Sequence, residues 1–272
     1  YRVALAGAGN RGQVHLHGFL KNKDKFEVVG LCDIKEEQLT ATAEKFDISP
    51  LFTDAEEMLK QTRPDVFCFA TPPEVRLSLV KLGVKYEVKA IALEKPMATS
   101  LPEARTILNL CQNNNIKAVV SHQQKYLNSL QKMKEILEDG EIGEIKQIQV
   151  STHLGMSILG THFLDYMIWA NKGTRVQSVV GHVHGRETLE DSHPAPDYLL
   201  GQLIFANGVR GIIECGYLSS SHLDSDKSYL DNRITVQGSH GYVWAETNGG
   251  WGTFSRATAG ETITGQGQTW EK

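Results

Sequence analysis

The chain has 272 residues, of which 40% are hydrophobic and 22% are charged, a composition typical of a folded globular protein. This length suits one large domain or two ordinary ones. The formal net charge of −4 provides no basic surplus, so nucleic acid is not an expected partner. No apolar run reaches the ~18 residues of a membrane span and no signal-peptide pattern is present, so we expect no membrane association.

The four cysteines are far apart in the sequence, at Cys32, Cys68, Cys111 and Cys215. They form no CxxC pair and no clustered zinc pattern. We therefore expect buried thiols in a reducing compartment and a cytoplasmic protein.

The first 121 residues alternate short apolar runs with helical segments. Five runs are predicted to be buried strands: Arg2–Ala6, Glu27–Cys32, Asp65–Ala70, Lys89–Leu93 and Lys117–Ser121. Capping-box patterns predict helix starts at Thr53–Glu56, Thr71–Glu74 and Ser100–Glu103. Strands alternating with helices indicate a parallel sheet covered on both faces, so residues 1–121 are predicted to form a Rossmann-type α/β domain.

Residues 122–272 have a different pattern. Helices are predicted at Leu127–Glu138 and Gly160–Asn171, and strands at Ile145–His153, Arg175–Gly185, Tyr198–Ala206, Val209–Tyr217, Arg233–Gln237 and Tyr242–Glu246. The dipeptide Asn207-Gly208 predicts a two-residue hairpin turn. The segment from Gly249 to Gly267 is rich in Gly and Thr and is predicted to be loop. We expect an α+β domain with an open, mostly antiparallel sheet, packed tightly on the first domain.

A glycine-rich turn follows the first predicted strand and reads GAGNRG over Gly7–Gly12. Gly7 permits a tight turn, Gly9 lets a pyrophosphate approach the backbone, and Gly12 lets helix and strand pack closely. The backbone N–H groups at the helix start, around Asn10 and Arg11, then face the phosphates. In this strand–turn–helix context the motif predicts a dinucleotide site.

An acidic residue, Asp33, ends the second strand, 21 residues after Gly12. A carboxylate at this position binds the ribose hydroxyls of the adenosine and repels a 2′-phosphate. The sequence therefore predicts NAD rather than NADP as the cofactor, although Lys35 weakens this preference.

The tripeptide Glu94-Lys95-Pro96 follows the strand Lys89–Leu93 directly. Ligands of an open parallel sheet bind at the carboxyl ends of its strands, so Lys95 is expected beside a bound cofactor. The alternative is a surface ion pair before a loop.

These motifs, with Ala70-Thr71-Pro72-Pro73 and with Gly160–Asp165 (GTHFLD), resemble the Gfo/Idh/MocA family, which includes glucose–fructose oxidoreductase and inositol dehydrogenase. The resemblance implies a Rossmann domain for a nicotinamide cofactor. It also implies a second domain whose open sheet often forms a homo-oligomer contact, with a sugar or polyol as substrate. Relatives usually run longer, so the second domain is expected to be incomplete at its carboxyl end.

The resemblance also implies roles for individual residues. Lys95 is expected near the nicotinamide and the reacting hydroxyl, and His162 is expected to accept the proton. Four residues are expected to line the cofactor: Thr71, Pro72, Glu94 and Gln123.

Two positions depart from the family pattern. Ile158 stands where relatives usually have an Asp four residues before the catalytic His. A carboxylate there would orient the imidazole, so another group must do so here, and Asp165 and Tyr166 lie within reach on the same helix. His153 is a further candidate. Arg76 stands where many relatives have His and is expected to be a solvated helix residue.

A second histidine group is formed by His182 and His184 on one predicted strand, with Asp191 and His193 nearby. A metal site is one interpretation, but no complete ligand set is present, so we expect solvated side chains and no bound metal.

The predicted function is NAD-dependent oxidation or reduction of a secondary alcohol of a sugar, polyol or related carbohydrate. Two alternatives stay open. One is a glycosidase that uses NAD for transient oxidation of a ring hydroxyl. The other is a non-catalytic sensor that binds the cofactor.

Overall fold

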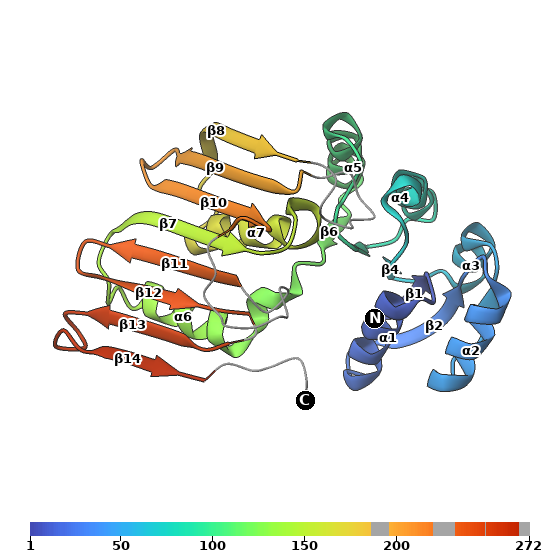
Figure 1. The fold of residues 1–272 in the computed structure, drawn as a ribbon. Coiled ribbons are helices and arrows are strands. Elements are labelled where there is room, and N and C mark those ends of the chain that lie inside the picture. The colour runs from blue at the N-terminus through green and yellow to red at the C-terminus, as the bar shows by residue number, and fades with distance from the viewer. Residues whose placement is uncertain (186–195, 220–231, 248, 267–272) are drawn as a thin grey trace. The chain divides into compact units, whose positions relative to one another are not determined.

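The computed structural model describes residues 1–185, 196–219, 232–247 and 249–266 (Figure 1). The chain divides into two compact units, Tyr1–Ser121 and His122–Lys272. The first contains a parallel sheet between helices, and the second contains a mostly antiparallel sheet. The predicted fold class is confirmed.

The first unit is built on a six-stranded parallel sheet with the order β3-β2-β1-β4-β5-β6. Its strands are β1 (Arg2–Ala6), β2 (Glu27–Cys32), β3 (Leu51–Phe52), β4 (Val66–Phe69), β5 (Ala90–Leu93) and β6 (Lys117–Val120). The strand order reverses between β1 and β4, which is the point where open α/β sheets bind ligands. The sequence pattern missed β3, because two residues at a sheet edge form no recognisable apolar run.

Helices cover both faces of this sheet. They are α1 (Asn10–Lys21), α2 (Glu36–Phe46), α3 (Ala55–Thr62), α4 (Arg76–Lys85) and α5 (Leu101–Asn113). Val3 and Leu5 of β1 belong to one core cluster, which includes Leu16 of α1. Ala4 and Ala6 belong to another, on the side of α3, α4 and α5. This alternation explains why the strands are apolar along their whole length.

The helix starts agree only partly with the predicted capping boxes. Ser100 caps α5, because its side chain accepts a hydrogen bond from the backbone N–H of Glu103 at 3.4 Å. The predicted box at Thr53–Glu56 is wrong by one residue. Asp54 caps α3 instead and accepts from the backbone N–H of Glu57 at 2.8 Å, since a carboxylate is a stronger N-cap than threonine.

The second unit is built on an eight-stranded sheet with the order β14-β13-β12-β11-β7-β10-β9-β8. Its strands are β7 (Ile145–Thr152), β8 (Val176–His184), β9 (Tyr198–Phe205), β10 (Arg210–Gly216), β11 (Asn232–Gly238), β12 (Gly241–Ala245), β13 (Trp251–Ser255) and β14 (Thr262–Gly265). Helices α6 (Asn128–Glu138) and α7 (Thr161–Ala170) lie against one face of this sheet (Figure 1). Short helical turns precede them: η2 (Gln123–Tyr126) and η3 (Met156–Gly160).

The β9–β10 hairpin closes on three residues rather than the predicted two. Phe205 donates its backbone N–H to the carbonyl of Val209, and Gly208 donates to the carbonyl of Phe205. Gly208 has a φ of +82°, whereas Asn207 is not among the positive-φ residues. A type I turn followed by a glycine bulge fits these bonds, because a two-residue type I′ turn needs positive φ at both positions.

The predicted loop from Gly249 to Gly267 is also wrong, because it contains β13 and β14. A Cβ at Gly252 would lie 2.6 Å from Nε1 of Trp244, and one at Gly265 would lie 2.4 Å from Nε1 of Trp251. Each glycine leaves room for an indole ring of the neighbouring strand, so glycine supports the sheet here instead of breaking it.

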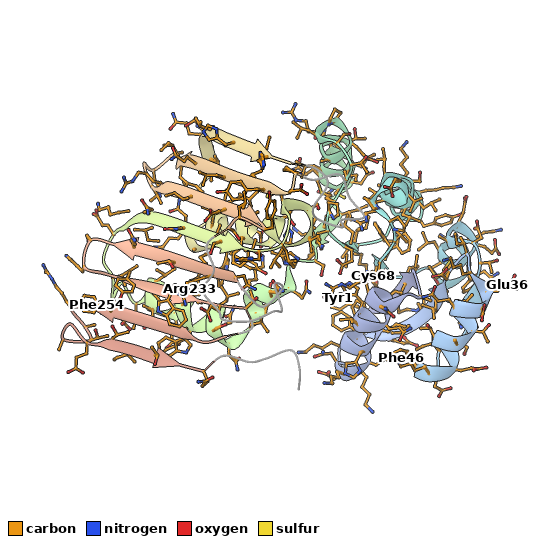
Figure 2. The ribbon with its side chains drawn as sticks, in the orientation of Figure 1. Tyr1, Glu36, Phe46, Cys68, Arg233 and Phe254 are labelled. Carbon is orange, nitrogen blue, oxygen red and sulfur yellow. The ribbon has the colours of Figure 1, made fainter. Side chains whose placement is uncertain are left out.

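All four cysteines are unpaired and buried, as predicted; Cys68 of β4 is labelled in Figure 2. Burial raises the pKa of Cys32, Cys68 and Cys215 to about 12 in each case. Across the described residues, no helix has both the length and the apolar character needed to cross a bilayer.

Two glycines of α1 give a matched test of this packing. A Cβ at Gly12 would lie 1.8 Å from the carbonyl oxygen of Gly7, while one at Gly18 meets no atom within 4 Å. Gly12→Ala is expected to lower the free energy of unfolding by about 2–3 kcal/mol, because the backbone must move. Gly18→Ala should raise it by about 0.5–1 kcal/mol through better helix propensity. Urea unfolding of both variants measures the difference, and equal effects would contradict the close packing.

Candidate active site

The turn between β1 and α1 is held by two of its three glycines. Gly7 has a φ of +98°, and a Cβ there would lie 2.6 Å from the carbonyl oxygen of Ala70. Gly12 packs on the carbonyl of Gly7. The fold itself therefore requires glycine at Gly7 and Gly12, because any side chain would collide with backbone.

Gly9 is different, because no backbone atom excludes a side chain there. Its backbone is extended, and a Cβ would approach only Nε2 of Gln38, at 3.3 Å. Gly9 is the N-cap of α1, and no side chain caps this helix, which begins with Asn10 and Arg11. The missing Cβ thus leaves the backbone accessible at the uncapped start of a helix, which is the arrangement that accommodates a phosphate.

A cavity of about 460 Å³ lies at the carboxyl ends of β1, β2 and β4. Five of the predicted cofactor residues line it: Gly7, Gly9, Asp33, Thr71 and Pro72. They come from three separate turns, so the strand order brings together residues that are far apart in the sequence. Its volume is in the range of small-molecule sites.

The carboxylate of Asp33 fixes two of these turns. Oδ2 accepts from the backbone N–H of Ala8 at 2.7 Å, and Oδ1 accepts from that of Lys35 at 2.9 Å. A carboxylate accepts about four hydrogen bonds, so capacity for two hydroxyl donors remains. A second carboxylate, Asp54, also lines the cavity. Burial and then the charges of Asp54 and Asp33 raise the pKa of Cys32, which indicates a negative environment at this end.

The third predicted capping box, at Thr71–Glu74, is wrong. The turn after β4 is a short 3₁₀ helix, η1 (Pro73–Val75), whose N-cap is Pro72 and which has no side-chain cap. Oγ1 of Thr71 is buried and has no hydrogen-bond partner among the described residues. A buried hydroxyl without a partner is costly, so its position on the cavity wall fits a polar ligand that would bind it.

Arg76 is not the solvated residue that the sequence predicts, because its side chain is only 3% exposed. Its guanidinium donates twice to the carbonyl of Thr71, at 3.1 and 2.6 Å, and also to the carbonyls of Glu94 and Pro96. Burial lowers its pKa to about 10, against the opposing charges of Glu94 and Glu74. Arg76 therefore ties the turn after β4 to the turn after β5.

Glu94 is also buried, at 5% exposure, rather than part of a surface ion pair. Oε1 lies 2.9 Å from Nε2 of His15, and Oε2 accepts from the backbone N–H of Lys95 at 3.3 Å. Burial alone would raise its pKa, but the hydrogen bond with His15 and the charge of Arg11 outweigh it and lower the pKa. Glu94 therefore stays ionised. It links the backbone of Lys95 to His15 on α1, the helix that follows the glycine-rich turn.

The remaining predicted residues lie outside this cavity. In the first unit these are Asn10, Arg11, Gly12, Glu94 and Lys95, and in the second they are Gln123 and His162.

His162 lies in the first turn of α7 and is 2% exposed. Nδ1 lies 3.1 Å from Oη of Tyr166, which donates to Oε1 of Gln124 at 3.1 Å. The His122 ring packs edge-on against the His162 ring, with 4.8 Å between centroids. Of the two predicted orienting groups, Tyr166 contacts His162 directly.

Asp165 contacts other residues. Its Oδ2 lies 2.8 Å from Nζ of Lys125 and 3.9 Å from Nδ1 of His122. Ile158 lies within η3.

The two strand histidines His182 and His184 are exposed on β8, and Asp191 and His193 lie outside the described residues. Within the part of the chain that the structure describes, no group of three or more His, Cys, Asp or Glu side chains is arranged to hold a metal ion.

Sequence reasoning wrongly placed Arg76 in solvent, and it missed four further residues that build these sites: Gln38, Asp54, His122 and Gln124. Asp54 had a recognisable signal, since an Asp before a helical run is a strong N-cap. His122 and Gln124 flank the predicted Gln123 and could have been considered with it. Arg76 had no such signal, because its bonds go to carbonyls of two turns that only the folded chain brings together.

Arg76 gives a direct test of the link between the two turns. Arg76→Met leaves three buried or part-buried carbonyls without this donor and is expected to lower the free energy of unfolding by about 2–4 kcal/mol and to weaken dinucleotide binding. Arg76→Lys should restore only part of both, because an ammonium lacks the planar fork. Arg105→Met, on the exposed side of α5, is the control and should stay within about 0.5 kcal/mol. Thermal unfolding and calorimetry with NAD measure the two effects; unchanged NAD affinity in Arg76→Met would contradict the role assigned to the link.

Comparison with known proteins agrees with the geometry. Residues 1–122 match the family model GFO_IDH_MocA, described as "Oxidoreductase family, NAD-binding Rossmann fold". The D-apiose dehydrogenase of Paraburkholderia graminis is 27% identical over 237 residues, which is 80% of this chain and 61% of that protein. The myo-inositol 2-dehydrogenase of Thermotoga maritima is 21% identical over 264 residues, 90% of this chain and 75% of that protein. The chain thus spans about three fifths of the D-apiose dehydrogenase.

Solved structures share the fold. An oxidoreductase from Agrobacterium radiobacter, in complex with NAD+, L-tartaric acid and magnesium, has a TM-score of 0.83 at 20% identity and covers 97% of this chain and 79% of its own. The WlbA dehydrogenase of Bordetella pertussis, in complex with NADH and UDP-GlcNAcA, has a TM-score of 0.76 at 23% identity, over 89% and 77%. The family model that residues 1–122 match is thus the Gfo/Idh/MocA oxidoreductase family, which is the family that the motifs of the chain resemble.

Proposed function

We propose that the protein is an NAD-dependent oxidoreductase that oxidises or reduces a secondary alcohol of a sugar, polyol or related carbohydrate. The observation that carries the proposal is the cavity at the ends of β1, β2 and β4, with the accessible Gly9, the Asp33 carboxylate and the unpartnered Thr71 hydroxyl. A carbohydrate substrate is supported by relatives named as dehydrogenases of D-apiose, myo-inositol and D-glucosides.

NAD is the proposed cofactor in preference to NADP. Asp33 and Asp54 both line the cavity, and among the described residues of its lining Lys35 is the one cation. A 2′-phosphate on the adenosine ribose would meet two carboxylates, whereas free ribose hydroxyls would find acceptors. Gly7, Gly9 and the start of α1 at Asn10 and Arg11 would hold the pyrophosphate.

In the proposed mechanism His162 accepts the proton of the substrate hydroxyl while the carbon–hydrogen bond breaks. Lys95 stabilises the negative charge that develops on that oxygen. The bound nicotinamide supplies the hydride acceptor. In the reverse direction His162 returns the proton to the forming alcohol. The cofactor is proposed to be lined by Thr71, Pro72, Glu94 and Gln123.

We propose a separate role for each of the two units. Residues 1–121 bind the dinucleotide, and residues 122–272 provide the substrate-binding and oligomerisation domain. The four buried, unpaired thiols favour a reducing compartment, so we propose a cytoplasmic location.

The activity is tested with purified protein, NAD or NADP, and a panel of sugars and polyols, with NADH absorbance as the readout. NAD is expected to support turnover of at least one compound, with NADP much poorer. Lys95→Met and His162→Asn should each lower kcat by about 10²–10⁴ while binding of NAD persists.

Three results would contradict the proposal in different ways. Failure to bind either nucleotide would remove the oxidoreductase function altogether. Release of the aglycone from an aryl glycoside without net NADH would indicate the glycosidase. Ligand-induced stabilisation with no turnover, unaffected by Lys95→Met and His162→Asn, would indicate a sensor.

The exposed sheet of the second unit is the proposed contact with a second copy of the chain. β8 is an edge strand in which Val179, Val180 and Val183 are each 64–66% exposed, so apolar side chains are uncovered on both of its faces. Arg233 and Phe254, labelled in Figure 2, lie on β11 and β13 of the same sheet. An exposed apolar edge strand can pair with another chain, and exposed apolar patches mark interaction sites.

Light scattering checks this contact. The wild-type protein is expected to have a molar mass at least twice that of one chain, and Val180→Asp with Val183→Asp should lower it. Leu108→Asp, at a half-exposed position of α5, is the control and should leave the mass unchanged. A monomer at all concentrations would contradict the contact.

A further inference from the structure

His162 lacks the carboxylate that relatives place four residues earlier, yet its Nδ1 is engaged. The nearest acid on α7, Asp165, contacts Lys125 and His122. The contact to Nδ1 comes from the hydroxyl of Tyr166, which continues to Gln124. The contact to Nδ1 is thus made by two neutral groups in series, the Tyr166 hydroxyl and the Gln124 amide.

The direction of the hydrogen bonds in this chain is fixed by what each group can donate. The Oε1 atom of Gln124 is an amide oxygen and only accepts, so Tyr166 uses its single hydroxyl hydrogen there. The bond between Tyr166 and His162 must then use a hydrogen from the ring, so Nδ1 of His162 carries the proton.

The phenol keeps its hydrogen under working conditions. Burial, and then the charge of Asp165, raise the pKa of Tyr166, so the hydroxyl does not ionise at neutral pH. A neutral imidazole has one N–H, and with the proton on Nδ1 its other nitrogen, Nε2, is the proton acceptor.

From this geometry we infer that Tyr166 and Gln124 are positioning residues that hold His162 in the Nδ1–H tautomer and so make Nε2 the base for the substrate hydroxyl. The inference rests on the proposed function for what Nε2 does, but the tautomer itself is independent of activity. The arrangement orients the base as a carboxylate would, without adding a negative charge beside it.

The first test reads the tautomer directly. Nitrogen NMR of protein with ¹⁵N-labelled histidine distinguishes protonated from unprotonated ring nitrogens, and His162→Asn assigns the signal. The wild type is expected to show a proton on Nδ1 and none on Nε2.

Tyr166→Phe should give a mixture of the two imidazole tautomers of His162. The control is Tyr198→Phe, which removes a hydroxyl that donates to Glu214 at 2.8 Å and should leave the His162 signal unchanged. A proton on Nε2 in the wild type, or an unchanged spectrum in Tyr166→Phe, would overturn the inference.

The second test is kinetic and separates positioning from folding. Tyr166→Phe should lower kcat about 10- to 100-fold, less than loss of the base itself, with KM for NAD unchanged. Gln124→Glu keeps an acceptor for Tyr166 and should therefore lower kcat less than Tyr166→Phe does. The added carboxylate favours the protonated ring, so the acid limb of the pH profile should move to higher pH by about half a unit to one unit. Neither variant alters His122, Lys125 or Asp165, the other titratable groups in this cluster.

The outcomes distinguish this inference from the proposed function. No NAD turnover in the wild type together with the Nδ1–H signal would reject the oxidoreductase and leave the tautomer assignment standing. Normal turnover in Tyr166→Phe would reject the positioning role. Loss of kcat in Gln124→Glu as complete as in Tyr166→Phe would show that Gln124 donates to Tyr166, which reverses the chain and also overturns the inference.

Discussion

The cavity at the ends of β1, β2 and β4 depends on the hydrogen bonds of one buried side chain, the guanidinium of Arg76. It binds carbonyls from the turn after β4 and from the turn after β5, so two loops that share no strand are fixed to one another. The Thr71 backbone is held by this contact, while its buried hydroxyl has no hydrogen-bond partner among the described residues. Glu94 then extends the link to His15 on α1. A buried cation thus fixes the turns after β4 and β5 to one another, which favours a preformed site.

In the second unit, the side chain of His162 is held by neutral groups rather than by a charged one. His162 has Ile158, an apolar residue, four positions before it, so no acid comes from that position. The contact to its ring comes instead from the Tyr166 hydroxyl, which continues to the Gln124 amide, in a region where an additional carboxylate would be costly to desolvate. The charged pair of Asp165 and Lys125 lies beside this chain rather than within it.

Sequence patterns predict the strands of the first unit and the glycine turn well, because apolar runs and φ-restricted positions are local properties. The motif also predicts why Gly7 and Gly12 must be glycine, since the turn is tight and the helix packs closely on it. The contacts of Arg76 depend on long-range topology, so no local pattern could reveal that it is buried. The strands β13 and β14 were hidden for another reason: Gly252 and Gly265 lie under indole rings of neighbouring strands, and a propensity scale counts such glycines only as breakers.

The buried thiols allow the opening of each unit to be measured separately. Three cysteines belong to the first unit and only Cys215 to the second. With thiol pKa values raised to about 12 at Cys32, Cys68 and Cys215, the reactive thiolate is scarce in the folded chain, and alkylation requires local or global opening. Mass spectrometry after a short pulse of an alkylating reagent would therefore time the opening of Cys215 independently of the other three, and would report which half of the chain yields first under heat or denaturant.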